Sequence, residues 1–265
     1  MVRQVTAFSN PTVKRLRSLR EKKGRRAEAL FLAEGLRIIV EARDSGRLPE
    51  IIAFSAEGAR HPLAAEIIAA TEAAGGEAIE TTHEILSKMS GKDNPQMVLG
   101  AYRETDPSLN RIDRSKADLW IVAQALRDPG NIGTILRTGD AVGAGGLILI
   151  DDSADPFSVE SVRASMGAIF TQEVVAARWP EFLSWLRAGD GQLVGTSLKA
   201  TQDYLEAEYR KPCFLLIGNE QQGLPADYEA ECDLLVKIPM AGRADSLNAA
   251  MATAVMAFAI QASWR

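Results

Sequence analysis

The stretch Leu119–Asn131, LWIVAQALRDPGN, decides how this chain folds. Its first six residues form an apolar run, which is typical of a strand that is buried on both faces of a sheet. Pro129 and Gly130 then break the strand, and Asn131 is a residue type that often caps a following helix. A strand that leads into a helix in this way is the repeating unit of parallel α/β sheets.

The same pattern recurs downstream. Five further apolar runs follow, and helical stretches separate most of them: GLILID, QEVV, QLVGTS, CFLLIG and LLVKIP. We therefore expect an α/β domain with a mostly parallel sheet that is covered on both faces. The last segment, residues 246–264, is helical in pattern and apolar almost all round. Such a helix is buried on more than one side, so we expect it in a core or a subunit interface.

The chain before this region predicts a smaller α/β unit of ~100 residues. The spacing of Leu32, Leu36, Ile39 and Val40 predicts a helix over residues 29–46. Short strands are expected in EIIAFS and QMVLGAYR, and helices in HPLAAEIIAATEAAGG and THEILSKMS. Residues 104–117 are polar and without apolar periodicity. The predicted domains are therefore 1–106 and 118–265, with residues 107–117 as a linker.

Composition favours a cytoplasmic globular protein. Of the 265 residues, 46% are hydrophobic and 25% charged, as in ordinary globular proteins. The sequence has no apolar run of membrane-spanning length and no secretory signal pattern at its start. The two cysteines, Cys213 and Cys232, do not form a CxxC pair and cannot make a zinc site by themselves.

Charge is distributed unevenly along the chain. Residues 1–26 contain nine Lys or Arg and one acid, Glu21, whereas the rest contains 21 basic and 34 acidic residues. A basic arm on an acidic body favours a nucleic-acid partner, because Lys and Arg displace counterions from phosphates. The alternative is a solvated, partly helical tail without a ligand.

Three polar loops follow predicted strands, at the sheet edge where α/β proteins bind ligands. The first contains Asn131, a good helix cap, and Arg137, whose guanidinium could reach a phosphate or a polarised hydroxyl or could be a surface charge. The second contains Gly218, where a ligand could approach the backbone, and Glu220, which could also be a turn residue. In the third, residues 238–248, Asp245 or Ser246 is expected to cap the last helix. Its free amides could bind a carboxylate or a ribose oxygen.

Several enzyme classes are disfavoured. Both histidines, His61 and His83, precede the second domain, so a Ser-His-Asp hydrolase there is unsupported. No His or Cys cluster has the spacing of a metal site. The loop LRDPGNIG is not the glycine fingerprint that a dinucleotide oxidoreductase needs. Chemistry based on Arg, Glu, Ser and Asn is better suited to transfer of an activated group.

Taken together, the three loops resemble the SpoU/TrmH family of SPOUT methyltransferases. The matching stretches are Asn131-x-Gly133-x-x-x-Arg137, Gly218-Asn219-Glu220-x-x-Gly223-Leu224 and Ile238-Pro239-Met240-x-Gly242-x-x-x-Ser246-Leu247-Asn248. Between them, Arg163-x-Ser165-x-Gly167-Ala168 is similar to a minor segment of the family. Three ordered motifs are far more specific than a single glycine loop. The front of the chain is similar to the L30e-like substrate-binding domain of many members.

This resemblance implies an α/β domain with a deep trefoil knot, S-adenosylmethionine as cofactor, and a homodimer whose site borrows residues from the partner. It implies 2′-O-methylation of a ribose, with ribosomal RNA favoured over transfer RNA because of the front domain. The implied catalytic residues are Arg137, Asn131, Glu220, Ser246 and Asn248. The implied cofactor-binding residues are Thr196, Ser197, Gly218, Asn219, Ile238, Met240, Ser246 and Leu247.

Arg137 would assist loss of the hydroxyl proton or stabilise the developing alkoxide; a guanidinium is an awkward base because it is normally protonated. This chain departs from the family pattern at Gln221, where glycine is common, and at Gly139, where alanine is usual. The alternatives are a transfer-RNA 2′-O-methyltransferase, a SPOUT base methyltransferase, and a non-catalytic RNA-binding assembly factor.

Overall fold

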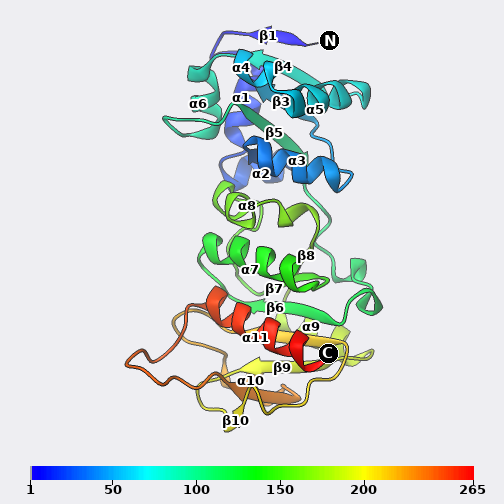
Figure 1. Ribbon diagram of the computed structural model, residues 1–265, viewed down its shortest axis with the longest axis vertical. Helices are drawn as coiled ribbons and strands as arrows, with labels where there is room; N and C mark the ends of the chain where they lie inside the picture. Colours follow the sequence, from blue (N-terminus) through cyan, green and yellow to red (C-terminus); the bar gives the residue numbers. More distant parts are fainter. Residues whose placement is uncertain (1) are drawn as a thin grey trace. The chain divides into compact units, whose positions relative to one another are not determined.

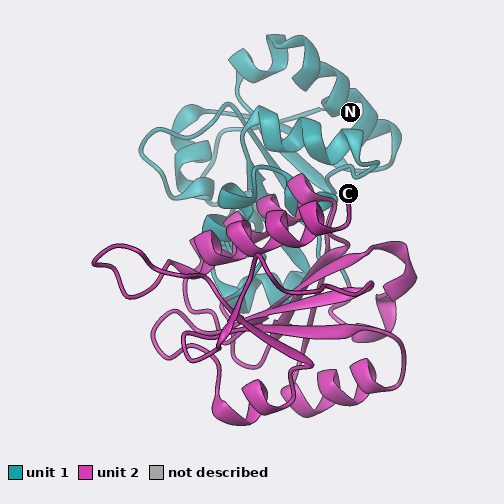
Figure 2. Cartoon of the chain, turned by 60° about the horizontal axis from the view of Figure 1, so that its bottom comes forward, with its two compact units in different colours: residues 1–105, 155–171 teal, residues 106–154, 172–265 magenta. Residues whose placement is uncertain are grey.

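The computed structural model describes residues 2–265, and the chain divides into two compact units (Figure 2). Unit 1 comprises Met1–Thr105 together with Asp155–Thr171, and unit 2 comprises Asp106–Ala154 together with Gln172–Arg265. A segment from the middle of the sequence therefore packs with the front of the chain. The predicted bounds 1–106, 107–117 and 118–265 stay a prediction.

Unit 1 contains a mixed sheet in the order β1-β4-β3-β5-β2 (Figure 1). β1, β4 and β3 run parallel, whereas β5 pairs antiparallel with both β3 and β2. The strands are β1 (Arg3–Val5), β2 (Leu30–Glu34), β3 (Ile51–Phe54), β4 (Glu77–Thr81) and β5 (Val98–Arg103). The helices are α1 (Pro11–Ser18), α2 (Lys22–Glu28), α3 (Leu36–Asp44), α4 (Ala56–Arg60), α5 (Pro62–Ala73), α6 (His83–Ser90) and α8 (Val159–Ser165). The predicted strands around residues 51 and 98 and the helices around 62 and 83 are confirmed.

The helix predicted over residues 29–46 is wrong in its first part. Residues 30–34 form strand β2, and only residues 36–44 form a helix, α3. Four successive buried residues, Leu30–Ala33, leave no polar face for a surface helix, whereas β5 alongside lets both faces of a strand be buried. Gly35 separates the two elements with a φ of 102°, a conformation that favours glycine.

The basic start of the chain is folded. Val13, Leu16 and Leu19 are buried in the core of unit 1, so α1 is an amphipathic helix on this unit. Arg25 is only 3% exposed. Its guanidinium donates to Asp155 Oδ2 at 2.6 Å and to the carbonyls of Leu19 and Arg20 at 2.9 Å. This cation therefore has a structural role and is not free to bind a ligand.

The segment Asp155–Thr171 completes the core of unit 1. Phe157 and Phe170 contact Phe31 and Tyr102, with ring centroids 5.0 Å apart for Phe31–Phe157 and 4.7 Å for Tyr102–Phe170. Aromatic packing of this kind joins the middle of the sequence to β2 and β5.

Unit 2 is built on a seven-stranded, wholly parallel sheet in the order β10-β12-β9-β11-β6-β7-β8. Its strands are β6 (Leu119–Gln124), β7 (Gly146–Ile150), β8 (Glu173–Ala177), β9 (Gln192–Thr196), β10 (Gln202–Asp203), β11 (Cys213–Ile217) and β12 (Leu234–Lys237). Six of these coincide with the six apolar runs, so the predicted parallel sheet is confirmed. Every residue of β6, β7 and β11 is buried, as two covered faces require.

Helices cover both faces of this sheet. α7 (Pro129–Val142) packs side by side with α11 (Ala249–Ser263) against one face (Figure 1). On the other face, α9 (Trp179–Arg187) buries Phe182 and Leu186 against Trp120 and Phe214. The short α10 (Ala226–Ala230) follows β11. Residues 107–117, predicted as a linker, contain two 3₁₀ helices, Leu109–Arg111 and Arg114–Lys116.

The terminal helix α11 has two different faces. Thr253, Met256 and Ile260 are fully buried, whereas Met251 and Phe258 are 56% and 53% exposed. One face is therefore in the core as predicted, and the other is free in this single chain. In residues 2–265, no helix combines the length and apolar character that crossing a membrane requires. The trefoil knot stays a prediction.

Candidate functional site at the carboxyl ends of four strands

The three polar loops meet at one edge of the sheet of unit 2. They follow β6, β11 and β12, and β9 lies between the last two. Because these neighbouring strands are parallel, their carboxyl ends lie together. The strand order changes side here: β7 and β8 extend the sheet on one side of β6, and β11, β9 and β12 extend it on the other. Such a switch point is where open α/β sheets bind ligands.

The loop after β11 is held by its own backbone. Asn219 and Gly223 exchange backbone hydrogen bonds of 3.2 and 3.0 Å, which closes a tight turn. A Cβ on Gly218 would lie 2.3 Å from the backbone carbon of Gly223, so only glycine fits. Gly223 has a φ of 68°, which also favours glycine. The sequence assigned the first glycine to ligand approach, but the neighbouring backbone is what requires it.

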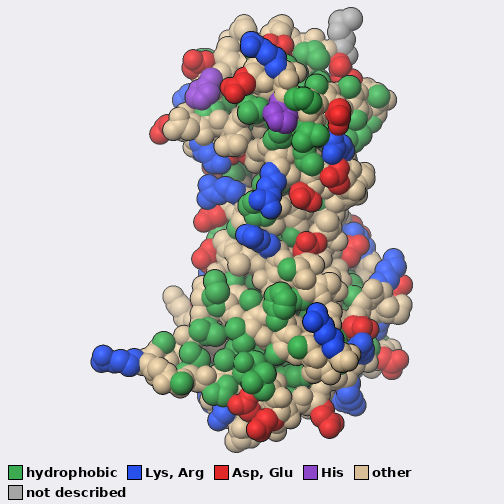
Figure 3. Space-filling view, in the orientation of Figure 1, with side chains coloured by type: hydrophobic (Ala, Val, Ile, Leu, Met, Phe, Trp, Pro, Cys, Tyr) green, Lys and Arg blue, Asp and Glu red, His purple; other side chains and the backbone are tan. Residues whose placement is uncertain are grey.

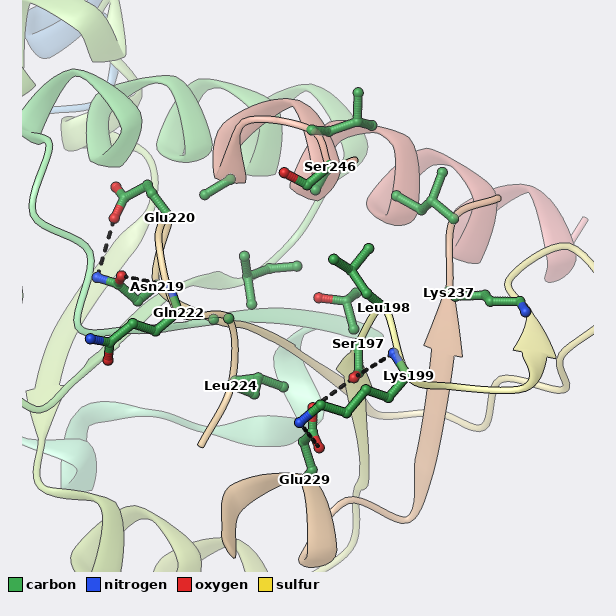
Figure 4. Close-up of a pocket in the computed structure, with 18 of the residues that line it drawn as sticks. Ser197, Leu198, Lys199, Asn219, Glu220, Gln222, Leu224, Glu229, Lys237 and Ser246 are labelled. Atoms are coloured by element: carbon green, nitrogen blue, oxygen red, sulfur yellow. Dashed lines mark hydrogen bonds and ion pairs between the residues drawn. The ribbon is translucent and has the colours of Figure 1, made fainter. Parts of the chain in front are cut away.

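A cavity of about 250 Å³ lies between these loops (Figure 4). All the residues that the sequence predicts to bind the cofactor line it: Thr196, Ser197, Gly218, Asn219, Ile238, Met240, Ser246 and Leu247. The structure therefore brings together residues that are up to 51 positions apart in the chain. Their role in binding stays a prediction, but their convergence is a fact of the fold.

The chemistry of this cavity fits an adenosyl group. Its apolar wall comprises Ile217, Leu224, Val236, Ile238 and Leu247, which suit a flat purine ring. At one end lie polar side chains of Ser197, Lys199 and Glu229 (Figure 4). Hydroxyl, carboxylate and ammonium groups are what a ribose and an amino acid require as partners. The residues present thus match S-adenosylmethionine in both its apolar and polar parts.

A second cavity, of about 730 Å³, shares the wall Asn219–Leu224 with the first. Asn131, Glu220 and Asn248, three of the predicted catalytic residues, line it. Glu220 lines both cavities, and so does Asn219. A group held in the smaller cavity therefore has a direct neighbour in the larger one, across the loop that follows β11.

The three catalytic candidates form one directed hydrogen-bond relay. Asn248 Oδ1 accepts from the amides of Ala250 and Met251, so its Nδ2 must donate, and it does so to Asn131 Oδ1 at 3.0 Å. Asn131 Nδ2 then donates to Glu220 Oε1 at 3.0 Å. Every amide orientation in the relay is fixed by its anchor at the start of α11. The relay holds the Glu220 carboxylate in place as an acceptor.

This environment keeps Glu220 ionised. Burial alone would raise the pKa of this carboxyl, but hydrogen bonds from the Asn131 side chain and from backbone amides outweigh it and leave the pKa below its usual value. A carboxylate with a lowered pKa is a weak base near neutral pH. Glu220 is therefore suited to hold a hydrogen-bond donor in position, and poorly suited to remove a proton.

Two expected caps are different in the structure. The N-cap of α7 is Asp128, whose side chain accepts from the amide of Gly130, and Asn131 lies inside the helix. The N-cap of α11 is Asn248, and neither Asp245 nor Ser246 caps it. Because Asp128 caps the helix, the Asn131 side chain, which is 7% exposed, is available for the relay. Ser246 lines the smaller cavity only.

Arg137 is not brought together with the other candidates. It is exposed, and it lines neither cavity. It follows Asn131 by six residues in α7, which is ~9 Å along the axis and about 240° around it. A rotation of about 240° is the same as about 120° in the other direction, so the two side chains leave the helix on different faces, and Arg137 does not join Asn131 at either cavity.

The structure explains one of the two departures from the family pattern, Gly139, and not the other, Gln221. A Cβ on Gly139 would lie 2.8 Å from Gln172 Oε1, so this side chain occupies the space that an alanine methyl would need. Gln221 is exposed and its amide donates to Asn219 Oδ1 at 2.9 Å. Nothing in the structure explains a glutamine side chain there.

Sequence reasoning missed three charged residues of the smaller cavity, namely Lys199, Glu229 and Lys237. Glu229 lies in the short α10, outside all three motif loops. No spacing in the sequence links it to Ser197, because only the pairing of β9 with β11 and β12 brings their neighbourhoods together.

Comparison with known proteins finds two family matches in different parts of the chain. Residues 118–258 match the SpoU rRNA Methylase family. Residues 10–100 match the MRM3-like substrate binding domain. The first match covers more than half of the chain, and the second confirms the expected N-terminal substrate-binding domain.

Similar proteins share nearly the full length. The chain is 33% identical to the 23S rRNA (uridine(2479)-2′-O)-methyltransferase of Streptomyces viridochromogenes, over 91% of this chain and 85% of that protein. It is 28% identical to the 23S rRNA (guanosine(2553)-2′-O)-methyltransferase RlmP of Bacillus subtilis, over 97% and 98%. Among solved structures, an AdoMet-bound rRNA methyltransferase from Sinorhizobium meliloti superposes with a TM-score of 0.91 at 40% identity, covering 98% of both chains.

Proposed function

The chain belongs to the SpoU rRNA methylase family, and from that premise we propose that it methylates a ribose 2′-hydroxyl of ribosomal RNA. One observation carries the proposal. A cavity suited to an adenosyl group and a larger cavity lined by Asn131, Glu220 and Asn248 share the wall Asn219–Leu224. Donor and acceptor of a transferred group need this adjacency, because alignment of the two supplies much of the acceleration.

S-adenosylmethionine is the cofactor of this enzyme, and when bound it supplies an electrophilic methyl group on a sulfonium. The apolar wall around Leu224, Val236 and Leu247 would hold its ring. Glu220, fixed by Asn131 and ionised, accepts a hydrogen bond from the incoming RNA and orients it. As the hydroxyl oxygen takes the methyl group, its proton passes to solvent water, and the cofactor's neutral thioether is the leaving group. Arg137 is the cation that stabilises the resulting negative charge.

The active form in this proposal is a homodimer. Met251 and Phe258, each more than half exposed, lie on the outer face of α11, and Figure 3 displays an extended apolar patch on unit 2. Large exposed apolar residues at helical spacing are typical of subunit interfaces. A dimer also gives Arg137 a role: it faces away from its own site and acts in the site of the partner.

Unit 1 supplies the electrostatic attraction for RNA. Six cations of α1, α2 and the turn between them are exposed: Lys14, Arg17, Arg20, Lys22, Lys23 and Arg26. Within residues 2–265, none of these six forms an ion pair, whereas Arg3, Arg15 and Arg25 do. Unpaired surface cations can replace the counterions of a phosphate backbone. We infer a cytoplasmic location from this proposed ribosomal-RNA partner.

Transfer of labelled methyl groups tests the proposal. The purified protein is incubated with tritiated-methyl S-adenosylmethionine and total RNA from a strain that lacks its gene. We expect label in ribosomal RNA, in a dinucleotide that resists alkaline hydrolysis, and its loss in Glu220→Gln. Label in transfer RNA or in a methylated base would identify one of the alternative enzymes. Absence of label, with no cofactor binding by calorimetry, would favour a non-catalytic RNA-binding factor.

A further inference from the structure

One end of the smaller cavity contains a carboxylate that neither the motifs nor the mechanism above uses. Glu229 Oε1 lies 2.6 Å from Ser197 Oγ, and Glu229 Oε2 lies 3.9 Å from Lys199 Nζ. The glutamate side chain is 15% exposed, whereas that of the lysine is 79% exposed. In Figure 4 this group lies at the opposite end of the cavity from Asn219 and Glu220.

The hydrogen bonds around Ser197 leave one carboxylate oxygen available. Ser197 Oγ accepts from the amide of Lys199 at 3.2 Å, so its own proton is donated to Glu229 Oε1. Oε2 has only the distant and highly exposed ammonium of Lys199, and an exposed pair of this kind contributes little. An anionic oxygen that lines a cavity is therefore free to accept hydrogen bonds from a ligand.

The carboxylate is also held in place before any ligand arrives. Its neighbour Tyr228 donates to Asp151 Oδ2 at 2.8 Å and stacks on Trp179, with ring centroids 3.9 Å apart and planes at 10°. On the other side, the amide of Ser197 donates to the carbonyl of Val236 at 3.0 Å. Both partners are thus anchored to the sheet, and a preorganised acceptor loses little entropy on binding.

We propose that Glu229, oriented by Ser197, binds the ribose diol of S-adenosylmethionine. This inference rests on the proposed function. Two adjacent hydroxyls are donors that a carboxylate can accept together, and acidic side chains bind ribose in the same way in dinucleotide sites. The cofactor's ammonium is the less suitable ligand, because Lys199 already places a positive charge 3.9 Å from Glu229 Oε2 and would repel it.

Calorimetry with two ligands tests the assignment. S-adenosylhomocysteine and 5′-methylthioadenosine both have the diol and a neutral sulfur, but only the first has the amino-acid part. We expect Glu229→Gln to weaken binding of both ligands by the same factor, roughly tenfold. The matched control is Glu231→Gln, two residues on, which removes an acid that does not line either cavity and should leave both affinities unchanged. Thermal melting checks that both variants are folded.

Each other outcome decides against the inference. Equal binding by Glu229→Gln and the unchanged protein would overturn it while leaving the proposed function intact. A loss with S-adenosylhomocysteine alone would assign the carboxylate to the ammonium. Failure of the unchanged protein to bind either ligand would contradict the proposed function itself, and the inference with it.

Discussion

Mixing two inactive variants tests whether Arg137 acts in the partner's site. Arg137→Ala removes the cation, and Glu220→Gln removes the carboxylate from the cavity lining. Asn131 and Arg137 are ~9 Å apart along α7 and about 120° apart around it, and Arg137 lines neither cavity, so we expect that each site combines Glu220 of one protomer with Arg137 of the other. Arg137→Ala alone should lower the transfer rate by about 10²–10³, as removal of one charge-stabilising donor does elsewhere.

The magnitude of recovery follows from the symmetry of a dimer. When the two variants are co-refolded at equal amounts, about half of the dimers are mixed, and one of the two sites in each mixed dimer has both intact residues. About one quarter of the sites should therefore be active. The assay is the initial rate of tritium transfer to RNA. No recovery at all would refute the reasoning, because it would place both residues in one protomer's site or Arg137 outside it. Mixing Arg137→Ala with the double variant is the control and should recover nothing.

Three further outcomes are expected. Asn131→Leu breaks the relay and should lower the single-turnover methylation rate about 10-fold or more. The cofactor Kd should stay nearly unchanged, because Asn131 lines only the larger cavity. An equally large weakening of cofactor binding would contradict the separation of the two cavities. The folded pKa of Glu220 is depressed, so its stabilising contribution should be complete above its unfolded pKa of about 4.3 and be lost as pH falls through the lower folded pKa. Urea midpoints of wild type and Glu220→Gln should show this, and a difference that does not change with pH would argue against it. Replacing Lys22 and Lys23 by Gln should reduce the slope of log K for RNA against log salt by about 1.5, whereas Arg60→Gln, an exposed cation on α4, should leave RNA affinity nearly unchanged; equal effects would rule out a localised RNA surface.

Local patterns predicted the second unit well. Each of its long strands is an uninterrupted apolar run, and such a run has few stable alternatives to a sheet covered on both faces. The same reasoning failed over residues 29–46, where helical spacing was present by chance across a strand and a helix. There the antiparallel partner β5, about 65 residues downstream, determines that residues 30–34 form a strand and not the first turns of a helix.

The sequence predicted which residues line the candidate site, but it did not predict how their side chains are arranged there. Six residues of the second and third motifs that were predicted to bind the cofactor line the smaller cavity, because each motif follows a strand and parallel strands end together. They could not show that Asn248 rather than Ser246 caps α11, or that the cap orients Asn131 and Glu220. Side-chain direction depends on contacts between loops that are more than 80 residues apart.

The sequence by itself determined that this chain is an α/β protein of the SpoU family with a substrate-binding domain in front, because apolar period and ordered motifs are local properties. Only the tertiary structure decided which side chains share a cavity. It placed Asp155–Thr171 in unit 1, brought Glu229 to Ser197, and turned Arg137 away from Asn131. These relations depend on strand order and helix rotation, which are set by burial of surfaces far apart in the chain and by no short stretch of residues.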